Sequence, residues 1–231
     1  MIGFYNYTVI LTYLSLVSAS CGIIAALSGG GHPYIGTFFL LFCGLCDAFD
    51  GKVARTKKER SQTERSFGVQ IDSLSDIVAF GVLPAAIGSA MLRRSPLGAL
   101  VYGTPLEKPL GVGVMAILVL YILAAMIRLA WYNVTEEERQ KTEDGVRKYY
   151  TGLPVTSSAL IFPVILLLQY VIPADITPVY FVTALFCAIA FLSPVQIRKP
   201  ELRGVLILVG IGAVEFLLLL VPMLVRKFLI H

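Results

Sequence analysis

Long apolar runs constrain this chain of 231 residues more than any other feature of its sequence. A membrane span needs roughly 20 mostly apolar residues, and it must form either a helix or part of a closed barrel. The runs are continuous and rich in Leu, Ala and Ile, without the alternation of barrel strands, so they predict helices. Seven runs occur, at about 6–27, 34–49, 67–91, 110–132, 154–172, 178–195 and 203–225.

Composition agrees with a membrane as the solvent. Charged residues make up 15% of the chain and hydrophobic residues 57%, whereas a soluble domain carries about 25% charged residues. The net charge of +4 is small, and the basic residues cluster beside the spans, where they set topology. We therefore expect an all-α integral membrane protein, a polytopic helical bundle with no nucleic-acid partner. It should form one membrane-embedded domain over residues 1–231, with a core at about 6–195 and an additional C-terminal helix at about 203–225.

The distribution of Lys and Arg predicts how the bundle is oriented. The connection between the second and third runs holds six of these residues, and the connection between the first and second runs holds none. Because loops rich in Lys and Arg favour the cytoplasm, the second and third runs should meet at the cytoplasmic face. The N-terminus is then expected in the cytoplasm and the C-terminus outside. An even number of spans, with the last run broken or re-entrant, is the alternative.

Four aspartates stand at the cytoplasmic ends of the second and third runs, surrounded by apolar sequence. Asp47 and Asp50 are three residues apart, and Asp72 and Asp76 are four residues apart, so each pair shares one face of a helix. A carboxylate in a membrane helix costs about 3 kcal/mol or more. Each of the four aspartates therefore needs a partner or a function.

A divalent cation would explain why the four carboxylates converge. If the two helix faces meet, like charges repel one another, and no comparable basic cluster is expected inside the bundle. Carboxylate oxygens suit Mg²⁺, Mn²⁺ or Ca²⁺, and Mg²⁺ commonly bridges carboxylates and substrate phosphates. Two other interpretations stay open: the aspartates cap helices near the headgroups, or they form the ion pathway of a cation transporter.

Small and basic residues surround the acids. Gly51, Ala54 and Gly68 permit the close approach of a helix or a ligand. Arg55 lies one turn beyond Gly51 at the predicted membrane surface, where it could hold a phosphate by two parallel hydrogen bonds. Packing alone also explains the small residues, and a positive-inside anchor explains Arg55 equally well.

Two stretches of the chain resemble the signature of the CDP-alcohol phosphotransferases. Residues 47–55 read DAFDGKVAR and residues 68–76 read GVQIDSLSD. They match the family pattern DxxDGxxAR, a spacer and GxxxDxxxD at all eight fixed positions. The spacer at 56–67 holds twelve residues, where the usual pattern has eight, so we expect a longer cytoplasmic turn.

The resemblance implies a metal-dependent phosphoryl-group transfer. Asp47, Asp50 and Asp72 are expected to hold two divalent ions, Mg²⁺ or Mn²⁺, against a diphosphate. Asp76 is expected to deprotonate the acceptor alcohol and also to touch metal. A base must lie within hydrogen-bond reach of the proton that it removes, and a position one turn from Asp72 meets that condition.

The resemblance also implies how the donor is bound and how the chain is assembled. The positions that match those lining the CDP site are Gly51, Ala54, Arg55 and Gly68. The implied fold is a six-helix core, here followed by one more helix. Family members tend to be homodimers, so a homodimer is expected here.

The flanking sequence is most similar to the bacterial-type phosphatidylserine synthases of this family. Residues 77–85 read IVAFGVLPA, residues 128–133 read RLAWYN and residues 150–154 read YTGLP, and each resembles a segment of that branch. The resemblance implies transfer of the phosphatidyl group from CDP-diacylglycerol to L-serine, with release of CMP. The site is then expected at the cytoplasmic face of a bacterial-type cell membrane.

Arg128 and Asn133 are the candidates for binding the acceptor. An intramembrane arginine needs an anionic partner, and the carboxylate of serine or a lipid phosphate would serve. An anchor at the cytoplasmic end of the span is the alternative for Arg128. The same chemistry with another acceptor, glycerol 3-phosphate or inositol phosphate, is the alternative for the reaction.

Overall fold

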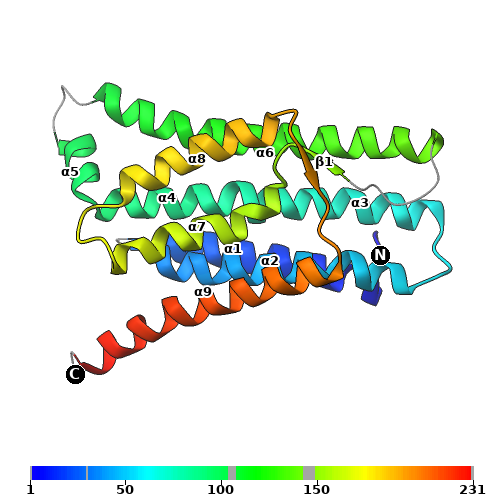
Figure 1. Ribbon diagram of the computed structural model, residues 1–231, viewed down its shortest axis with the longest axis horizontal. Coiled ribbons are helices and arrows are strands. Elements are labelled where there is room, and N and C mark those ends of the chain that lie inside the picture. The colour runs from blue at the N-terminus through cyan, green and yellow to red at the C-terminus, as the bar shows by residue number, and fades with distance from the viewer. Residues whose placement is uncertain (1, 30, 104–107, 143–148, 230–231) are drawn as a thin grey trace.

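A computed structural model of the chain describes residues 2–29, 31–103, 108–142 and 149–229. Most of them are helical, and most of the helices run along the long axis of the molecule (Figure 1). Among the described residues, five helices are long and apolar enough to cross a membrane, and two further apolar helices are shorter. The predicted all-α polytopic bundle is therefore confirmed, and the protein is an integral membrane protein.

A helix occupies each of the seven apolar runs, and one short helix, α5, lies between two of them. The α-helices are α1 Ile10–Leu27, α2 Pro33–Thr56, α3 Gln62–Asp76, α4 Leu83–Arg94, α5 Pro96–Gly103, α6 Lys108–Thr142, α7 Ser158–Leu167, α8 Thr177–Leu192 and α9 Leu202–Leu229. Two short strands pair with each other, β1 Tyr149–Thr151 and β2 Gln196–Arg198.

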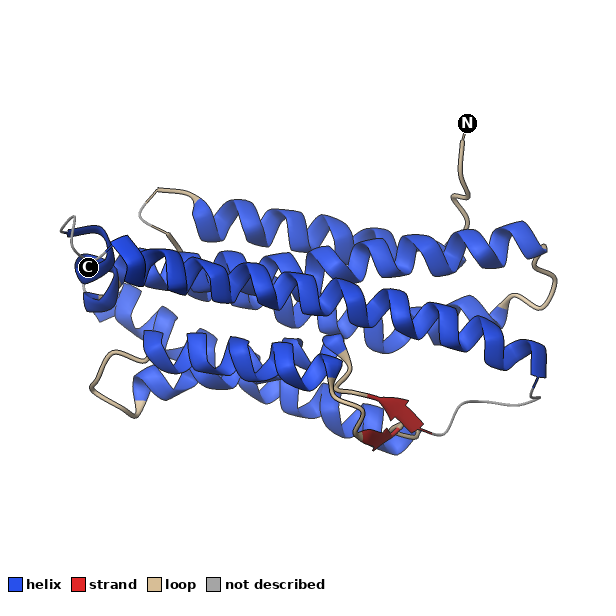
Figure 2. Cartoon of the chain, turned by 90° about the horizontal axis from the view of Figure 1, so that it is seen from above, coloured by secondary structure: helices blue, strands red, loops and turns tan. Residues whose placement is uncertain are grey.

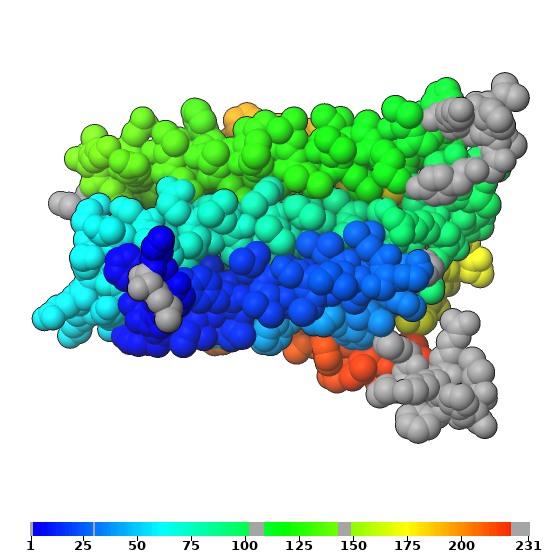
Figure 3. All heavy atoms as spheres, turned by 180° about the vertical axis from the view of Figure 1, so that it is seen from behind, coloured from blue at the N-terminus to red at the C-terminus, as the bar shows by residue number. Residues whose placement is uncertain are grey.

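The helices pack in layers that bring α2 and α3 near each other at one end of the bundle. From behind, α6, the α3–α4 rod and α1 form three bands side by side (Figure 3). Helix α2 forms a hairpin with α1 and also packs on α4 and α7. Helix α9 lies along one edge of the bundle against α2 and α7 (Figure 1).

Helices α3 and α4 form one rod, joined by a π-helical segment at Ile77–Val82 that begins directly after Asp76. Pro84 has no N–H to donate to the Phe80 carbonyl one turn earlier. Tyr121 Oη instead donates to that carbonyl at 2.5 Å. Because unpaired backbone groups are costly in lipid, this bond from α6 stabilises the rod where its geometry changes, next to an aspartate.

Aromatic rings form the centre of the core between α4, α6, α7 and α8. The ring of Phe162 lies 4.7 Å from that of Tyr180 and 5.5 Å from that of Tyr121, measured between centroids. Tyr180 Oη donates to the carbonyl of Pro84 at 2.7 Å. Both tyrosine hydroxyls are therefore satisfied although both side chains are fully buried, as the interior of a membrane protein requires.

Helix α6 extends well past the predicted end of its apolar run at about 132, because its last turns carry ion pairs of their own. Arg139 Nη2 lies 2.7 Å from Glu136 Oε1, and Lys141 Nζ lies 2.9 Å from Glu137 Oε1. Pairs at these spacings stabilise a solvated helix. The helix therefore projects beyond the apolar layer without a change in direction.

The two strands form an antiparallel ribbon against the flank of the bundle (Figure 2). Tyr150 pairs with Ile197 in its register. Gly152 follows β1 with a φ of 75°, and a Cβ atom at this position would lie 2.5 Å from the carbonyl oxygen of Phe191. Its N–H donates to the carbonyl of Val195 at 2.8 Å. Only glycine accommodates this conformation and this contact, which gives a physical reason for the glycine of the YTGLP segment.

Candidate active site

The paired aspartates meet at the end of the bundle where α2 runs into α3. Helix α2 continues through Gly51 as far as Thr56, so Asp47 and Asp50 lie on its last turns. The carboxylates of Asp50 and Asp72 are within hydrogen-bonding reach of each other. Asp76 is buried and close enough to the other three carboxylates to interact with their charges. The structure thus brings the two helix faces together.

A cavity of about 1260 Å³ opens beside these carboxylates. Three of the four aspartates line it, namely Asp47, Asp72 and Asp76, whereas Asp50 lies behind them in contact with Asp72. The other predicted site residues that line the cavity are Gly51, Arg55, Arg128 and Asn133. Ala54 and Gly68 lie outside its wall.

The donor chemistry of the acids fits a hard divalent cation. Carboxylate oxygens are the ligands that Mg²⁺ and Mn²⁺ prefer, and two partly buried carboxylates in contact repel unless a cation or a proton lies between them. No three Asp, Glu, His or Cys side chains within the described part of the chain are gathered closely enough to surround one ion. The ligand set is thus chemically suitable, and a closed coordination shell is not preformed.

Basic side chains form part of the cavity wall, which corrects the expectation that no basic cluster lies near the acids. Five cationic side chains line the cavity together with the three aspartates: Lys52, Arg55, Arg128, Arg198 and Lys199. The site therefore combines carboxylates that suit metal ions with cations that suit anionic groups of a substrate.

Arg128 is the most deeply placed of these cations, with 7% of the residue exposed. Its guanidinium carbon lies 5.0 Å from the ring centroid of Tyr132 and 5.8 Å from that of Tyr150. It is also near enough to Asp76 for their charges to interact. The aromatic rings hold the guanidinium by cation–π attraction at the wall of the cavity.

Asn133 lies one further turn along α6 and is hydrogen-bonded to the aspartate helix. Its Nδ2 donates to Ser73 Oγ at 2.7 Å. Ser73 lies between Asp72 and Asp76 on α3, and it also lines the cavity. The structure thus places both predicted acceptor residues, Arg128 and Asn133, opposite the second aspartate pair.

Away from the charged residues the same cavity becomes apolar. This part lies between α2, α7 and α9 and is lined by side chains without charge: Phe38, Leu41, Phe42, Leu45, Leu160, Ile161, Val205, Leu208, Val209, Ala213, Phe216 and Leu217. One continuous cavity therefore has a charged end and an apolar end. That combination suits an amphiphile with a polar headgroup and long hydrocarbon chains.

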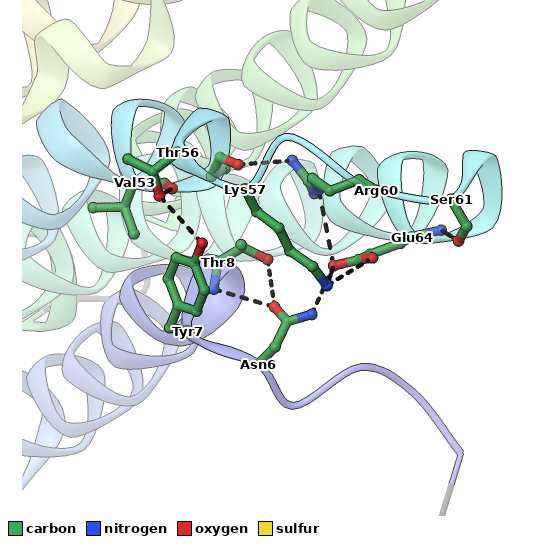
Figure 4. Close-up of polar contacts among 10 residues, drawn as sticks. Asn6, Tyr7, Thr8, Val53, Thr56, Lys57, Arg60, Ser61 and Glu64 are labelled. Carbon is green, nitrogen blue, oxygen red and sulfur yellow. Dashed lines mark hydrogen bonds and ion pairs between the residues drawn. The ribbon is translucent and has the colours of Figure 1, made fainter.

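The extra residues of the spacer form a turn and the first turns of α3, tied together by Glu64 (Figure 4). Glu64 is buried, with 5% of the residue exposed. It accepts a hydrogen bond from Asn6 Nδ2 at 2.6 Å and two from Lys57 Nζ at 2.9 and 3.1 Å. Its own N–H donates to the capping Ser61 Oγ at 3.1 Å. The spacer thus consists of a turn at 57–61 and the first turns of α3, which Glu64 holds together.

Arg60 from this turn covers the two predicted CDP residues that do not line the cavity. Its Nη1 donates to the carbonyl of Ala54 at 3.4 Å. Its Nη2 lies 2.9 Å from the position that a Cβ atom of Gly68 would take. A side chain at position 68 would therefore displace the flexible end of the Arg60 side chain.

Sequence reasoning missed Lys52, Tyr132, Tyr150, Arg198 and Lys199 as residues of the site. Lys52 stands at a variable position of the DxxDGxxAR pattern, and Tyr150 begins the YTGLP segment, so both carried a local signal. Arg198 and Lys199 carried none, because only the pairing of β1 with β2 brings them to the cavity.

Comparison with known proteins agrees with this arrangement. The family model described as CDP-alcohol phosphatidyltransferase matches residues 5–192. This match covers more than half of the chain and includes both aspartate pairs. The chain belongs to the CDP-alcohol phosphatidyltransferase family. Strand β2 and helix α9 lie beyond the matched segment.

Individual members of the family share a quarter to a third of their aligned residues with this chain. A CDP-diacylglycerol–serine O-phosphatidyltransferase of Saccharomyces cerevisiae is 33% identical over 138 residues, which cover 58% of this chain and 43% of the relative. A protein of the same name from Mycobacterium tuberculosis is 25% identical over 157 residues, covering 67% and 48%. An archaetidylserine synthase of Methanothermobacter thermautotrophicus is 32% identical over 148 residues, covering 64% and 53%. The chain thus spans about half the length of the curated relatives it matches.

Proposed function

We propose that this protein transfers the phosphatidyl group from CDP-diacylglycerol to L-serine, forming phosphatidylserine and CMP. One observation carries the proposal. A single cavity extends from the paired aspartates into an apolar groove that is lined by three helices, α2, α7 and α9. A nucleotide-linked lipid has a diphosphate for the charged end and acyl chains for the apolar end. A transporter of free cations has no use for the apolar part of this cavity.

Metal ions and aspartates share the chemistry in this proposal. When bound, two Mg²⁺ or Mn²⁺ ions would stabilise negative charge on the diphosphate oxygens. Asp47, Asp50 and Asp72 would hold these ions, with Asp76 at the edge of the same group. The metal ions that these carboxylates hold, together with the basic side chains of the cavity, would neutralise the charge of the diphosphate.

Asp76 would act as the general base. It would accept the proton of the serine hydroxyl, whose oxygen then bonds to the phosphorus that carries diacylglycerol. The bond from that phosphorus to the oxygen of CMP breaks, and CMP leaves. The burial of Asp76 on the wall of the cavity supports this assignment, because a base must reach the acceptor and be shielded from water.

The donor and acceptor would approach from different sides. Gly51 and Arg55 line the cavity beside α2 and would contact the CDP group, while Ala54 and Gly68 would shape that site from behind. Arg128 and Asn133 on α6 would bind serine opposite Asp76. The names of the yeast, mycobacterial and archaeal relatives support serine as the acceptor, since each names the transfer of a lipid to serine or a serine lipid.

The arrangement in the membrane forms part of the same proposal. Lys and Arg gather in the connection between α2 and α3, which favours the cytoplasmic face of a bacterial-type membrane for this end of the bundle. We place the whole chain in one catalytic domain and expect it to act as a homodimer, as the family resemblance implies.

A comparison of acceptors tests the proposal. Purified protein would be incubated with CDP-diacylglycerol and Mn²⁺ or Mg²⁺, and CMP release would be measured with L-serine, glycerol 3-phosphate, inositol phosphate or no acceptor. Release that depends on both serine and metal is the expected result. Release with another alcohol would discard serine while keeping the active site, and no release with any acceptor would contradict the enzyme assignment.

A further inference from the structure

Lys199 lies beyond the segment that matches the family model, yet it lines the cavity beside the aspartates. Its Nζ is 5.5 Å from the ring centroid of Tyr150. The guanidinium carbon of Arg128 is 5.8 Å from the same centroid. One tyrosine ring therefore holds two cations from distant parts of the chain, one on α6 and one just after β2.

The backbone fixes Lys199 in this position. Strand β2 ends at Arg198, directly before Lys199, and its Ile197 pairs with Tyr150 of β1. The N–H of Gly152, after β1, donates to the carbonyl of Val195, directly before β2, at 2.8 Å. The N–H of Leu153 donates to the carbonyl of Ala190 on α8 at 2.9 Å. A segment held at both strands presents its next side chain with little freedom.

Arg198, the neighbour of Lys199, is oriented differently. Its side chain is 77% exposed and forms an ion pair of 3.2 Å with Glu201. Lys199 is partly buried against Tyr150 instead. Of these two basic residues, Lys199 is thus the one that lies against the ring of Tyr150, which Arg128 also contacts.

The basic side chains of the cavity suit a ligand with an anionic group close to a hydroxyl. Asp76, the proposed base, and Arg128 are near enough for their charges to interact, so an acceptor with its hydroxyl at Asp76 would have its nearest substituents at Arg128. The attraction of a cation to a ring leaves its N–H groups able to donate to an anion. A hydroxy amino acid such as serine has its carboxylate close to its hydroxyl, so it could contact Arg128 and Asp76 at the same time.

We infer that Lys199 binds the carboxylate of the acceptor amino acid together with Arg128 and determines the preference for an amino acid over a simple alcohol. The inference rests on the proposed function, since it concerns the acceptor side of that same site. Strand β2 and Lys199 lie outside the segment that matches the family model, whereas β1 lies within it. Together they then complete the acceptor site in this chain.

The test is a comparison of Lys199→Met, Lys199→Arg and wild type, with Arg203→Met as the matched control. Arg203 is an exposed cation of the same segment and does not line the cavity. Because Lys199→Met removes a hydrogen bond between charged groups, it should raise KM for serine by about tenfold or more. KM for CDP-diacylglycerol should stay unchanged, Lys199→Arg should recover most of the serine affinity, and Arg203→Met should match wild type.

Ethanolamine, which lacks the carboxylate of serine, distinguishes recognition from a general structural effect. Wild type should prefer serine to ethanolamine, and this preference should shrink in Lys199→Met, because only the serine reaction loses a contact. An unchanged preference, or an unchanged KM for serine, would overturn the inference. Lys199→Gln replaces Lys199→Met if the latter elutes as an aggregate in size-exclusion chromatography.

The two proposals fail in different ways. Absence of serine-dependent CMP release by the wild-type protein would remove the proposed function and the inference with it. Serine-dependent release by wild type that is equally efficient in Lys199→Met would leave the proposed function standing and reject Lys199 as an acceptor residue.

Discussion

Asn133 on α6 donates a 2.7 Å hydrogen bond to Ser73 on α3, between the two aspartates of that helix. This bond joins the proposed acceptor side of the cavity to the proposed base. Ser73→Ala should therefore leave the Asn133 amide without this acceptor and allow it to turn. We expect KM for serine to rise a few-fold, in line with about 1 kcal/mol for one hydrogen bond. Steady-state kinetics would check this, and a change confined to KM for the lipid donor would contradict it.

Removal of a proposed metal ligand should abolish turnover. Even partners of metal ligands contribute about 10–100-fold to affinity or activity, so Asp72→Asn should lower CMP release by at least about a hundredfold. EDTA should have the same effect on wild type, and added Mn²⁺ should restore wild type but not the variant. Full activity after extensive chelation would contradict a metal-dependent site.

Asp76 should differ from the other aspartates in what it affects. Loss of a general base typically costs about 10²–10⁴-fold in rate. Asp76→Asn should therefore lose turnover while still binding CDP-diacylglycerol in a binding assay with Mg²⁺. If this variant loses metal and nucleotide binding together, Asp76 is a ligand rather than the base.

Arg128 should control affinity for the acceptor. Arg128→Ala removes a charged hydrogen-bond donor worth about 1.5–3 kcal/mol, so KM for serine should rise about tenfold or more. Arg128→Lys should recover only part of this, since lysine lacks the planar fork of donors. An unchanged KM for serine in Arg128→Ala would eliminate this residue from the acceptor site.

Gly152 should be essential for the ribbon. Gly152→Ala places a Cβ atom 2.5 Å from the Phe191 carbonyl at a φ of 75°, which should destabilise the protein by more than about 1 kcal/mol. The melting temperature in detergent should fall by at least about 2–4 °C. Gly210→Ala is the control, because a Cβ atom there meets nothing within 4 Å; equal effects of the two variants would contradict the role given to Gly152.

Much of the fold followed from local patterns in the sequence. Apolar runs predicted the helices because lipid requires each span to satisfy its own backbone. The spacing of Asp47 and Asp50 predicted a shared helix face, and α2 continues past Gly51 as far as Thr56. Spacing could not show that Asp50 would lie behind the cavity wall, since this depends on how α2 is rotated against α3.

The basic wall could not be predicted for a related reason. Arg128 and Lys199 meet on one ring only because β1 pairs with β2 and Gly152 fixes the turn beside α8. Such pairings between distant short segments leave no periodic pattern in the sequence. The π-helical turn after Asp76 was likewise hidden, although Pro84 is the local residue that removes a helix hydrogen bond there.

The most direct test of the central claim follows labelled serine into lipid. Purified protein would be given CDP-diacylglycerol, Mn²⁺ and ¹⁴C-labelled L-serine, with Asp72→Asn as the matched inactive variant. We predict chloroform-soluble label that co-migrates with phosphatidylserine for wild type, depends on CDP-diacylglycerol and on the metal, and is lost in the variant. Label that stays entirely in the aqueous phase with wild type, or that enters lipid equally well with Asp72→Asn, would contradict the account.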